Sequence, residues 1–286
     1  MKINFTKMHG LGNDFIVIDC RRKKIAGLSR LVRKLSHRRF GIGFDQAIIL
    51  FPSKKADFRM DIYNADGGRV EMCGNGIRCL AKYIWDRNLS RKDVLEIETL
   101  AGIIKPKKAG RLVRIDMGEP ILEAKDIPVK ISSEFGVGSS EEQNSKPVIE
   151  YPLQTEDKEF KITCVSMGNP HCVIFADDVD NFPVAKYGPL IENHPLFPKR
   201  TNVEFIQVIN KKRIKMRVWE RGSGETLACG TGACAALVAA NLNGLAGKKA
   251  TIHLSGGDLK IEWSEKDNHI YMTGPAAEVF EGVAEV

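Results

Sequence analysis

The sequence predicts a mixed α+β (α/β) fold made of two pseudo-symmetric, β-rich domains, each wrapped around a central helix. Three observations support this prediction: the length, a repeat at one fixed offset, and short strand-like runs that lead into one strongly apolar helix in each half. At ~150 residues per domain, 286 residues correspond to two domains. With 43% apolar and 28% charged residues, the chain is typical of a globular protein that buries a real core.

The repeat is centred on two near-identical tetrapeptides. Cys73-Gly74-Asn75-Gly76 and Cys229-Gly230-Thr231-Gly232 lie 156 residues apart (73 to 229). The same gapless offset brings three further polar positions into register: Asn13 with Asn169, Gln46 with Asn202, and Asn64 with Glu220. Because one offset aligns all of these positions, we expect the chain to contain two copies of one structural unit.

The hydrophobic pattern predicts the same order of elements in both copies. Alternating or continuous apolar residues indicate strands at 3–5, 15–19, 47–50 and 58–63, and again at 172–175, 203–208 and 214–219. Helical spacing follows each Cys-Gly-x-Gly motif, from Gly76 to Trp85 and from about 232 to 241. Strands at 95–99 and 112–117 precede a boundary near Glu119-Pro120, and the polar stretch 132–147 is expected to be a loop without chemistry.

Composition excludes several classes of protein. The net charge is +7, but the basic runs are short and lack an aromatic stacking pattern, which favours solvated faces over a nucleic-acid surface. The longest uncharged stretch, 226–247, is interrupted by glycines and asparagines, so no membrane span is expected. Seven cysteines, an odd number without a Cys-x-x-Cys pair, argue against a disulfide framework and a zinc ribbon and indicate a reducing cytoplasm. The histidines show no metal-ligand spacing. Cys20, Cys79, Cys164, Cys172 and Cys234 are expected to be core residues.

The two remaining cysteines stand where a strand-rich segment turns into a helix. A helix start offers free N–H groups and a partial positive charge, which suit a bound carboxylate or phosphate and favour thiolate over thiol. Neither motif continues to Gly-Lys-Ser/Thr, so a nucleotide-binding loop is excluded. Two thiols on opposite faces of one carbon suit inversion of a stereocentre, which needs a base on one face and an acid on the other.

These motifs closely resemble those of the diaminopimelate epimerases. The resemblance runs in the same order through essentially the whole chain, in 8–15, 64–67, 71–79, 168–171, 219–222 and 228–232. It implies a pyridoxal-independent isomerase, without cofactor or metal, that interconverts LL- and meso-2,6-diaminoheptanedioate in lysine and peptidoglycan precursor biosynthesis. It also implies a cytoplasmic homodimer that binds this small molecule between its two domains. Because the last strand of this family returns to the first domain, we expect domains of 1–119 with 274–286, and 120–273.

The resemblance also assigns roles to individual residues. Cys73 and Cys229 would be the acid–base pair, and Glu220 would pair with the reacting ammonium, aided by the carbonyl of Arg221. The reacting carboxylate would be held by Gly74, Asn75, Gly230 and Thr231, the distal end of the substrate by Asn64, Asn169, Asn202 and the Arg221 guanidinium, and Asn13 and Gln46 would complete the site. His171 could accept a thiol proton or orient a cysteine.

Two alternatives remain open from the residues. One is a proline-racemase-like enzyme, although that family tends to have histidine where this chain has Asn75. The other is a non-catalytic amino-acid-binding or redox-sensing protein, which would not need both thiols. The chain also departs from the family at Phe280, where a tyrosine often supports the dimer: the ring remains but the hydroxyl is absent.

Overall fold

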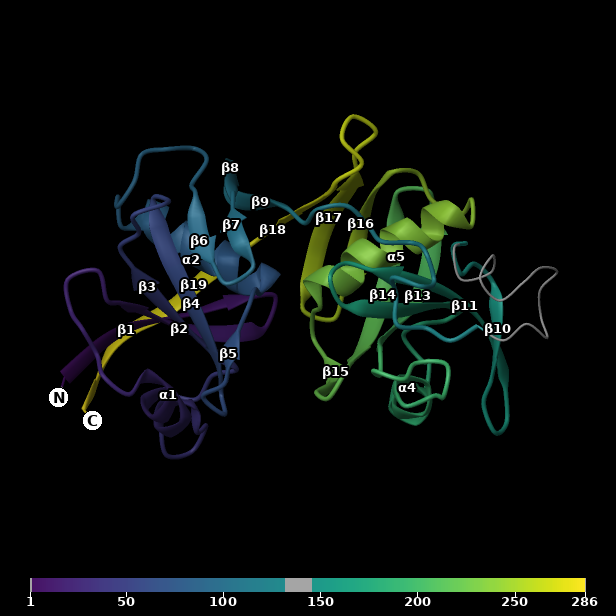
Figure 1. Cartoon of the computed structure of the whole chain (residues 1–286), viewed down its shortest axis with the longest axis horizontal. Helices are drawn as coiled ribbons and strands as arrows, with labels where there is room; N and C mark the ends of the chain where they lie inside the picture. The colour runs from purple at the N-terminus through teal and green to yellow at the C-terminus, as the bar shows by residue number, and fades with distance from the viewer. Residues whose placement is uncertain (1, 132–145, 286) are drawn as a thin grey trace. The chain divides into compact units, whose positions relative to one another are not determined.

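The computed structural model describes residues 2–131 and 146–285, and the chain forms two compact units (Figure 1). Unit 1 comprises Met1–Asp116 and Thr273–Val286, and unit 2 comprises Met117–Met272. The chain therefore passes between the units after 116 and again after 272, where the sequence had suggested 119 and 273. Most of the loop expected at 132–147 lies outside the described residues.

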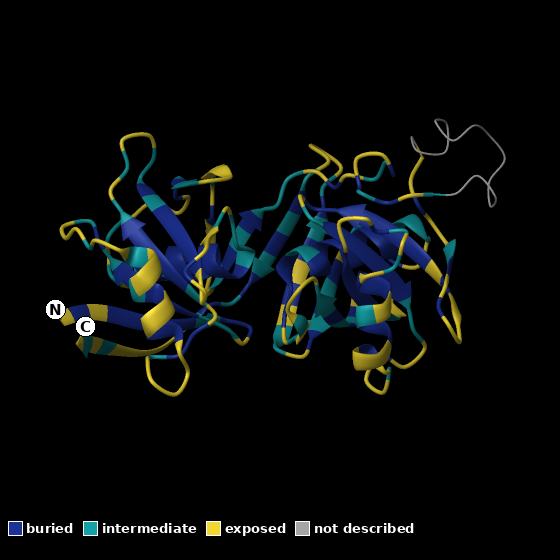
Figure 2. Ribbon diagram, turned by 60° about the horizontal axis from the view of Figure 1, so that its bottom comes forward, coloured by how far each residue is buried: buried dark blue, intermediate teal, exposed yellow. Residues whose placement is uncertain are grey.

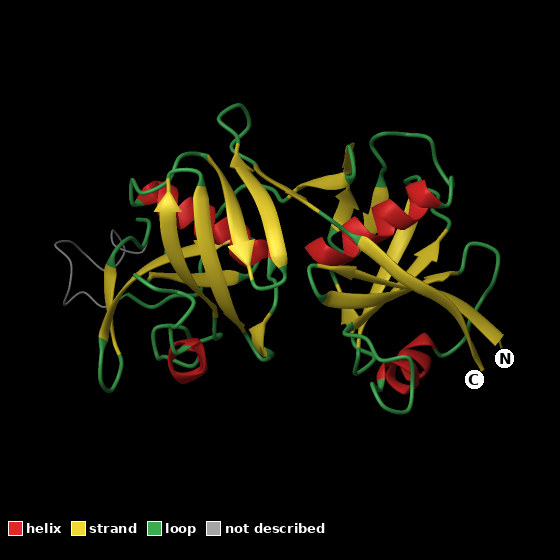
Figure 3. Ribbon diagram, turned by 180° about the vertical axis from the view of Figure 1, so that it is seen from behind, coloured by secondary structure: helices red, strands yellow, loops and turns green. Residues whose placement is uncertain are grey.

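Unit 1 is built on one mixed sheet. Its strands run in the order β19-β1-β2-β3-β4-β6-β7, with β5 paired to β4. Their bounds are β1 (Lys2–Gly10), β2 (Asn13–Asp19), β3 (Gln46–Phe51), β4 (Phe58–Asn64), β5 (Arg69–Val70), β6 (Ile97–Thr99), β7 (Gly102–Ile104) and β19 (Ala277–Glu285). A short hairpin of β8 (Lys107–Ala109) and β9 (Leu112–Asp116) follows β7. The first and last strands pair antiparallel, so both termini lie together (Figure 3).

Two helices pack on opposite faces of this sheet. Alternate residues of β2 point to different sides: Ile16 belongs to a buried cluster with Val32 of α1 (Leu28–Ser36). Phe15 and, from β3, Ile48 instead lie against Gly76 in the first turn of α2 (Gly74–Asp86). The sheet thus curves around α2 and presents its other face to α1.

Unit 2 repeats this design. Its strands include the order β10-β11-β12-β13-β14-β16-β17-β18, with β15 paired to β14. Their bounds are β10 (Tyr151–Gln154), β11 (Glu159–Ser166), β12 (Pro170–Phe175), β13 (Asn202–Asn210), β14 (Arg213–Glu220), β15 (Gly224–Thr226), β16 (Lys249–Leu254), β17 (Gly257–Trp263) and β18 (Ile270–Gly274). Its helices are α4 (Val184–Glu192) and α5 (Gly230–Leu242).

The offset of 156 residues holds through the whole fold. It carries α2 onto α5 and α1 onto α4 without a shift of a single residue, and it carries β3 onto the start of β13. The parallel pairing of β2 with β3 recurs as that of β12 with β13. The predicted α+β fold of two similar halves is therefore confirmed, but each half has a second helix that the sequence did not predict. Helix α4 contains Gly188-Pro189, which interrupts its apolar pattern. Helix α1 begins after Gly27 and does have apolar residues at helical spacing, Leu28, Leu31, Val32 and Leu35, so this helix could have been predicted.

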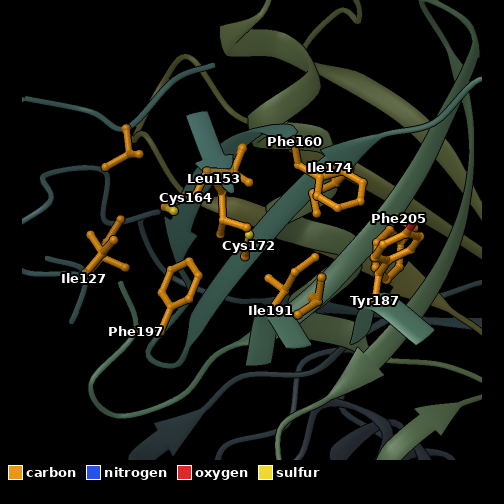
Figure 4. Close-up of a cluster of buried hydrophobic side chains, with 14 of the residues drawn as sticks. Ile127, Leu153, Phe160, Cys164, Cys172, Ile174, Tyr187, Ile191, Phe197 and Phe205 are labelled. Carbon is orange, nitrogen blue, oxygen red and sulfur yellow. The ribbon is translucent and has the colours of Figure 1, made fainter. Parts of the chain in front are cut away.

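The buried cluster between the sheet of unit 2 and α4 explains two of the cysteines. Cys164 and Cys172 lie among apolar side chains of this cluster, which include Phe160, Ile174 and Ile191 (Figure 4). Cys20, Cys79 and Cys234 are also buried, so the prediction that these five cysteines are core residues is confirmed. Within the described parts of the chain, no helix is long and apolar enough to cross a membrane.

Candidate active site

Unit 1 gathers its candidate residues at one end of its sheet. Asn13 begins β2, Gln46 begins the parallel strand β3, and Asn64 ends the antiparallel strand β4, directly opposite Gln46. The Gln46 amide donates to Asn64 Oδ1 at 2.8 Å, whereas Gln46 Oε1 is buried and has no hydrogen-bond partner among the described residues. A ligand ammonium or N–H would satisfy this acceptor.

Cys73 occupies the N-cap of α2 beside these residues. Its backbone is extended and its carbonyl accepts from Ile77 N at 2.9 Å, so its side chain stands at the start of the helix. Asn13 Oδ1 lies 3.9 Å from Cys73 Sγ and accepts from the Asn75 amide at 3.2 Å. The Asn13 amide donates to Asp45 at 2.9 Å, and this bond fixes which atom of Asn13 faces the thiol.

A buried arginine supports this arrangement. Arg78 is fully buried in α2 and donates to Asn75 Oδ1 at 2.8 Å and to the Pro275 carbonyl at 3.1 Å. It links the helix start to the returning C-terminal segment. Arg78 lies within the segment 71–79 that carries the resemblance, but it was not predicted as a site residue; its signal is a charged residue on the buried side of a helix.

Cys229 occupies the equivalent N-cap of α5 in unit 2. Its carbonyl accepts from Ala233 N at 3.0 Å, and its Sγ lies 3.5 Å from the Thr231 hydroxyl. Burial raises the pKa of the Cys229 thiol well above its usual range, and the nearby carboxylates Glu220 and Glu204 raise it further. Hydrogen bonds from the first turn of α5 lower the pKa of Cys229, but they do not offset this rise. The helix start therefore does favour the thiolate of Cys229, as expected, but burial and the two carboxylates outweigh this effect.

A buried acid–imidazole pair lies behind Asn169 in the same unit. His171 Nδ1 is 2.7 Å from Glu204 Oε1, and both side chains are inaccessible to solvent. His171 Nε2 is 3.1 Å from Asn169 Oδ1, and the Asn169 amide donates to Thr231 at 3.3 Å. Glu204 was not predicted as a site residue because it lies within an apolar run that indicates a strand.

The turn after β14 carries Glu220 and Arg221. Glu220 Oε1 accepts from the Thr226 hydroxyl, and the Arg221 guanidinium donates to the Lys199 carbonyl at 3.1 Å. Asn202 holds this turn: its Oδ1 accepts from Arg221 N at 3.0 Å, and its amide donates to the Pro170 carbonyl at 2.9 Å. Asn202 is therefore a buried brace between the start of β12 and the turn.

Each unit thus brings its own predicted residues together at the start of one helix. In unit 1, Asn13 and Asn75 are hydrogen-bonded to each other beside Cys73, and Gln46 pairs with Asn64 at the same end of the sheet. In unit 2, Thr231 and Glu220 act on Cys229, Asn169 links His171 to Thr231, and Asn202 holds the turn that carries Glu220. Across residues 2–131 and 146–285, no group of three or more His, Cys, Asp or Glu side chains is arranged to hold a metal ion. The chemistry available is that of two thiols, two helix starts and several amides.

Comparison with known proteins shows which family this chain resembles. The family model for diaminopimelate epimerase matches residues 5–123 and 163–279. The diaminopimelate epimerase of Moorella thermoacetica is 54% identical over 286 residues, which cover 98% of each chain. That of Methanococcus maripaludis is 51% identical and covers 99% of this chain and 100% of its own.

Solved structures extend the likeness to the fold. A PhzF-family phenazine biosynthesis protein of Bacillus anthracis aligns over 100% of both chains with a TM-score of 0.73 at 17% identity. A hydroxyproline epimerase of Agrobacterium vitis aligns with a TM-score of 0.68 at 14% identity, over 99% of this chain and 92% of its own. At these identities the structures show a shared fold alone. Together with the family model, which spans both halves, the curated relatives show that the chain belongs to the diaminopimelate epimerase family.

Proposed function

We propose that this protein is an epimerase that interconverts LL- and meso-2,6-diaminoheptanedioate by two-base proton transfer, without a cofactor. One observation carries the proposal: in a chain of this family, two helices related by the offset of 156 residues each begin directly after an N-cap cysteine. One thiolate removes the α-proton from one face of the substrate, and the thiol of the other cysteine supplies a proton to the opposite face. Cys73 and Cys229 exchange these roles when the reaction runs in reverse.

The residues around the cysteines would bind the two ends of the substrate. The reacting carboxylate accepts from the N–H groups at both helix starts, which also stabilise the carbanion formed when the proton leaves. Glu220 pairs with the reacting ammonium, and the buried, unpaired Gln46 Oε1 offers an acceptor for a substrate N–H. The proposed substrate-binding residues are Asn13, Gln46, Asn64, Gly74, Asn75, Asn169, Asn202, Glu220, Arg221, Gly230 and Thr231.

We further propose that the enzyme is a cytoplasmic homodimer. The odd number of cysteines fits a reducing compartment. The outer strand β19 is exposed or half-buried along its length (Figure 2). It carries three exposed apolar side chains, Val279, Phe280 and Val283, which are 56%, 48% and 58% exposed. Exposure of apolar side chains on an edge strand to water is unfavourable, and a second copy of the chain would cover them.

Isotope exchange tests the proposed reaction. With LL-diaminopimelate in deuterated water, early meso product should carry deuterium at the inverted carbon while recovered substrate carries little, because each face has its own base. Cys73→Ala and Cys229→Ala should each lower kcat by at least ~10²–10⁴-fold, since either change removes one proton carrier. Cys79→Ala and Cys234→Ala are matched controls in the same helices and should keep the activity.

Two results would contradict the proposal. Equal early labelling of both isomers would indicate one shared base. A folded protein that does not convert LL-diaminopimelate at all would exclude the reaction.

A further inference from the structure

The pair Glu204–His171 has no counterpart in the other half of the molecule. The offset of 156 residues places Phe15 and Ile48 of unit 1 at the positions of His171 and Glu204. Phe15 and Ile48 pack against Gly76 in the first turn of α2, and Glu204 packs in the same way against Gly232, where an added Cβ would lie 2.6 Å from Glu204 Oε1. The scaffold therefore needs only two apolar side chains at these positions.

Burying this polar pair costs stability, and unit 1 avoids that cost because it has apolar side chains at the equivalent positions. Both side chains are inaccessible to solvent, and Glu204 Oε2 has no hydrogen-bond partner among the described residues. A buried ion pair is often no more stabilising than apolar side chains of similar volume. Burial also raises the pKa of Glu204, against the lowering effect of His171. A role beyond packing is the simplest reason for this pair.

The pair begins a chain of hydrogen bonds that ends at Cys229. His171 Nδ1 is hydrogen-bonded to Glu204 Oε1, and in the observed orientation of Asn169 the His171 Nε2–H donates to Asn169 Oδ1. The Asn169 amide donates to Thr231 Oγ1, and this oxygen lies 3.5 Å from Cys229 Sγ.

The direction of these hydrogen bonds decides whether Thr231 can donate to the sulfur of Cys229. A threonine hydroxyl has one proton and two lone pairs. With one lone pair occupied by the Asn169 amide, Thr231 can accept from the Cys229 thiol, or rotate and donate its proton to the thiolate. Donor bonds that all point the same way strengthen one another in a low-dielectric interior. Cys229 needs this support because its surroundings within unit 2 are apolar and acidic.

We propose that Glu204 and His171 are positioning residues that fix the direction of the Asn169–Thr231 hydrogen bonds and thereby stabilise the Cys229 thiolate. No proton passes along the chain: when Cys229 gives its proton to a carbon, the Thr231 hydroxyl turns toward the sulfur. The proposal rests on the proposed function only for the catalytic purpose of the stabilised thiolate, because the stabilisation itself exists without substrate. The titratable groups of unit 2 that act on the pair and on Cys229 are Glu220 and Cys172.

The test copies unit 1 into unit 2. The double variant His171→Phe/Glu204→Ile has the side chains that the same scaffold already accepts at Phe15 and Ile48. Without substrate, the rate of alkylation by iodoacetamide is measured for each cysteine by peptide mass spectrometry between pH 6 and 10. Loss of the Glu204 carboxylate alone would lower the pKa of Cys229 and speed its alkylation. We instead expect Cys229 to react about tenfold more slowly at pH 8, with its pH profile displaced to higher pH, because the hydrogen bonds that support the thiolate are lost. Cys73, in the other unit, is the internal control and should keep its rate.

A second pair of variants tests the last link. Thr231→Val removes the hydroxyl and should slow Cys229 alkylation as the double variant does, with no further loss when the changes are combined. Thr231→Ser keeps the hydroxyl and should keep the rate. An unchanged or faster Cys229 in either the double variant or Thr231→Val would overturn the proposal. These rates need no epimerase activity, so a failure of the proposed function would leave this result readable on its own.

Discussion

At the scale of single residues, the two thiols lie beside opposite buried charges. The start of α2 is braced by the guanidinium of Arg78, and the start of α5 by the carboxylate of Glu204. Asn13 presents only an acceptor to Cys73, whereas Thr231 presents a group that can donate or accept to Cys229. Two cysteines at equivalent positions of one repeated fold therefore have different chemical surroundings.

Asp14 is the residue for which we predict a pH-dependent contribution to stability. Burial alone would raise the pKa of Asp14, but hydrogen bonds from Arg38 at 2.9 Å and Lys7 at 2.6 Å lower it well below its usual range. A carboxyl whose folded-state pKa is depressed stabilises the fold above its unfolded pKa of ~3.9 and loses this effect as pH falls toward the folded value.

Asp14→Asn should therefore lower the free energy of unfolding at pH 7 by about 1.5–3 kcal/mol. The difference from wild type should shrink as pH falls below ~4. Urea unfolding at several pH values measures both effects. Asp157→Asn is the control: its pKa is also lowered, by Lys186, but the pair is exposed and should contribute far less. A deficit for Asp14→Asn that stays constant down to pH 2 would contradict this account.

At the scale of elements, α4 holds the turn that carries Glu220 and Arg221. Glu192, the last residue of α4, is buried and accepts from Trp219 Nε1 at 2.7 Å, Gly222 N at 2.9 Å and Arg200 at 3.1 Å. The helix lies close to β14 because Gly188 has no side chain: a Cβ there would lie 2.5 Å from the Trp219 ring. A helix without catalytic residues thus positions part of the site.

Glu192→Ala should destabilise the protein by about 1–3 kcal/mol, because Trp219 Nε1, Gly222 N and Arg200 lose a buried, charged acceptor. It should also raise KM for diaminopimelate, since the turn with Glu220 loses its support. Glu192→Gln is the matched control: its carbonyl oxygen still accepts one of the bonds, so it should lose less. Thermal unfolding and steady-state kinetics measure the two effects. An unchanged Tm and KM in the alanine variant would mean that α4 does not support the turn.

The sequence predicted those elements whose pattern is strong and local. Ile77, Leu80, Ala81 and Ile84 repeat at helical spacing and are all buried in α2. The polar residues of the site were found because the repeat aligns them. Contacts that depend on tertiary packing were not predictable from local pattern. Glu204 is the clearest example: its partner His171 lies 33 residues away on a neighbouring strand, and only comparison with Ile48 in the other copy would have made it stand out.

At the scale of the whole molecule, the proposed dimer depends on β19. Phe280 packs edge-on against Phe5 within unit 1, with ring centroids 6.0 Å apart. Val283 lies an odd number of residues from Phe280 and points to the other face, whereas Val279 lies at the bulge where the pairing with β1 shifts register. Both valines are exposed. These two valines are the side chains that a second copy would cover.

Sedimentation of the full chain tests the dimer. The wild type, with a chain mass of 31.8 kDa, should sediment as a dimer, and Val279→Asp/Val283→Asp should sediment as a monomer, because two charges would enter an apolar contact. Ile209→Asp, at an exposed apolar position in unit 2, should remain a dimer. A monomeric wild type, or a dimeric valine double variant, would exclude β19 as the interface.

The pairing of the first strand with the last has a consequence for how the protein is made. A ribosome releases β1 first, but its partner β19 leaves only with the final residues, Ala277–Glu285. Unit 2 is one continuous stretch of chain, so it can complete its sheet while unit 1 still waits for its last strand. Until then β1 has an open edge, which other chains can pair with. Nascent chains stalled before residue 277 should therefore be those most dependent on chaperones.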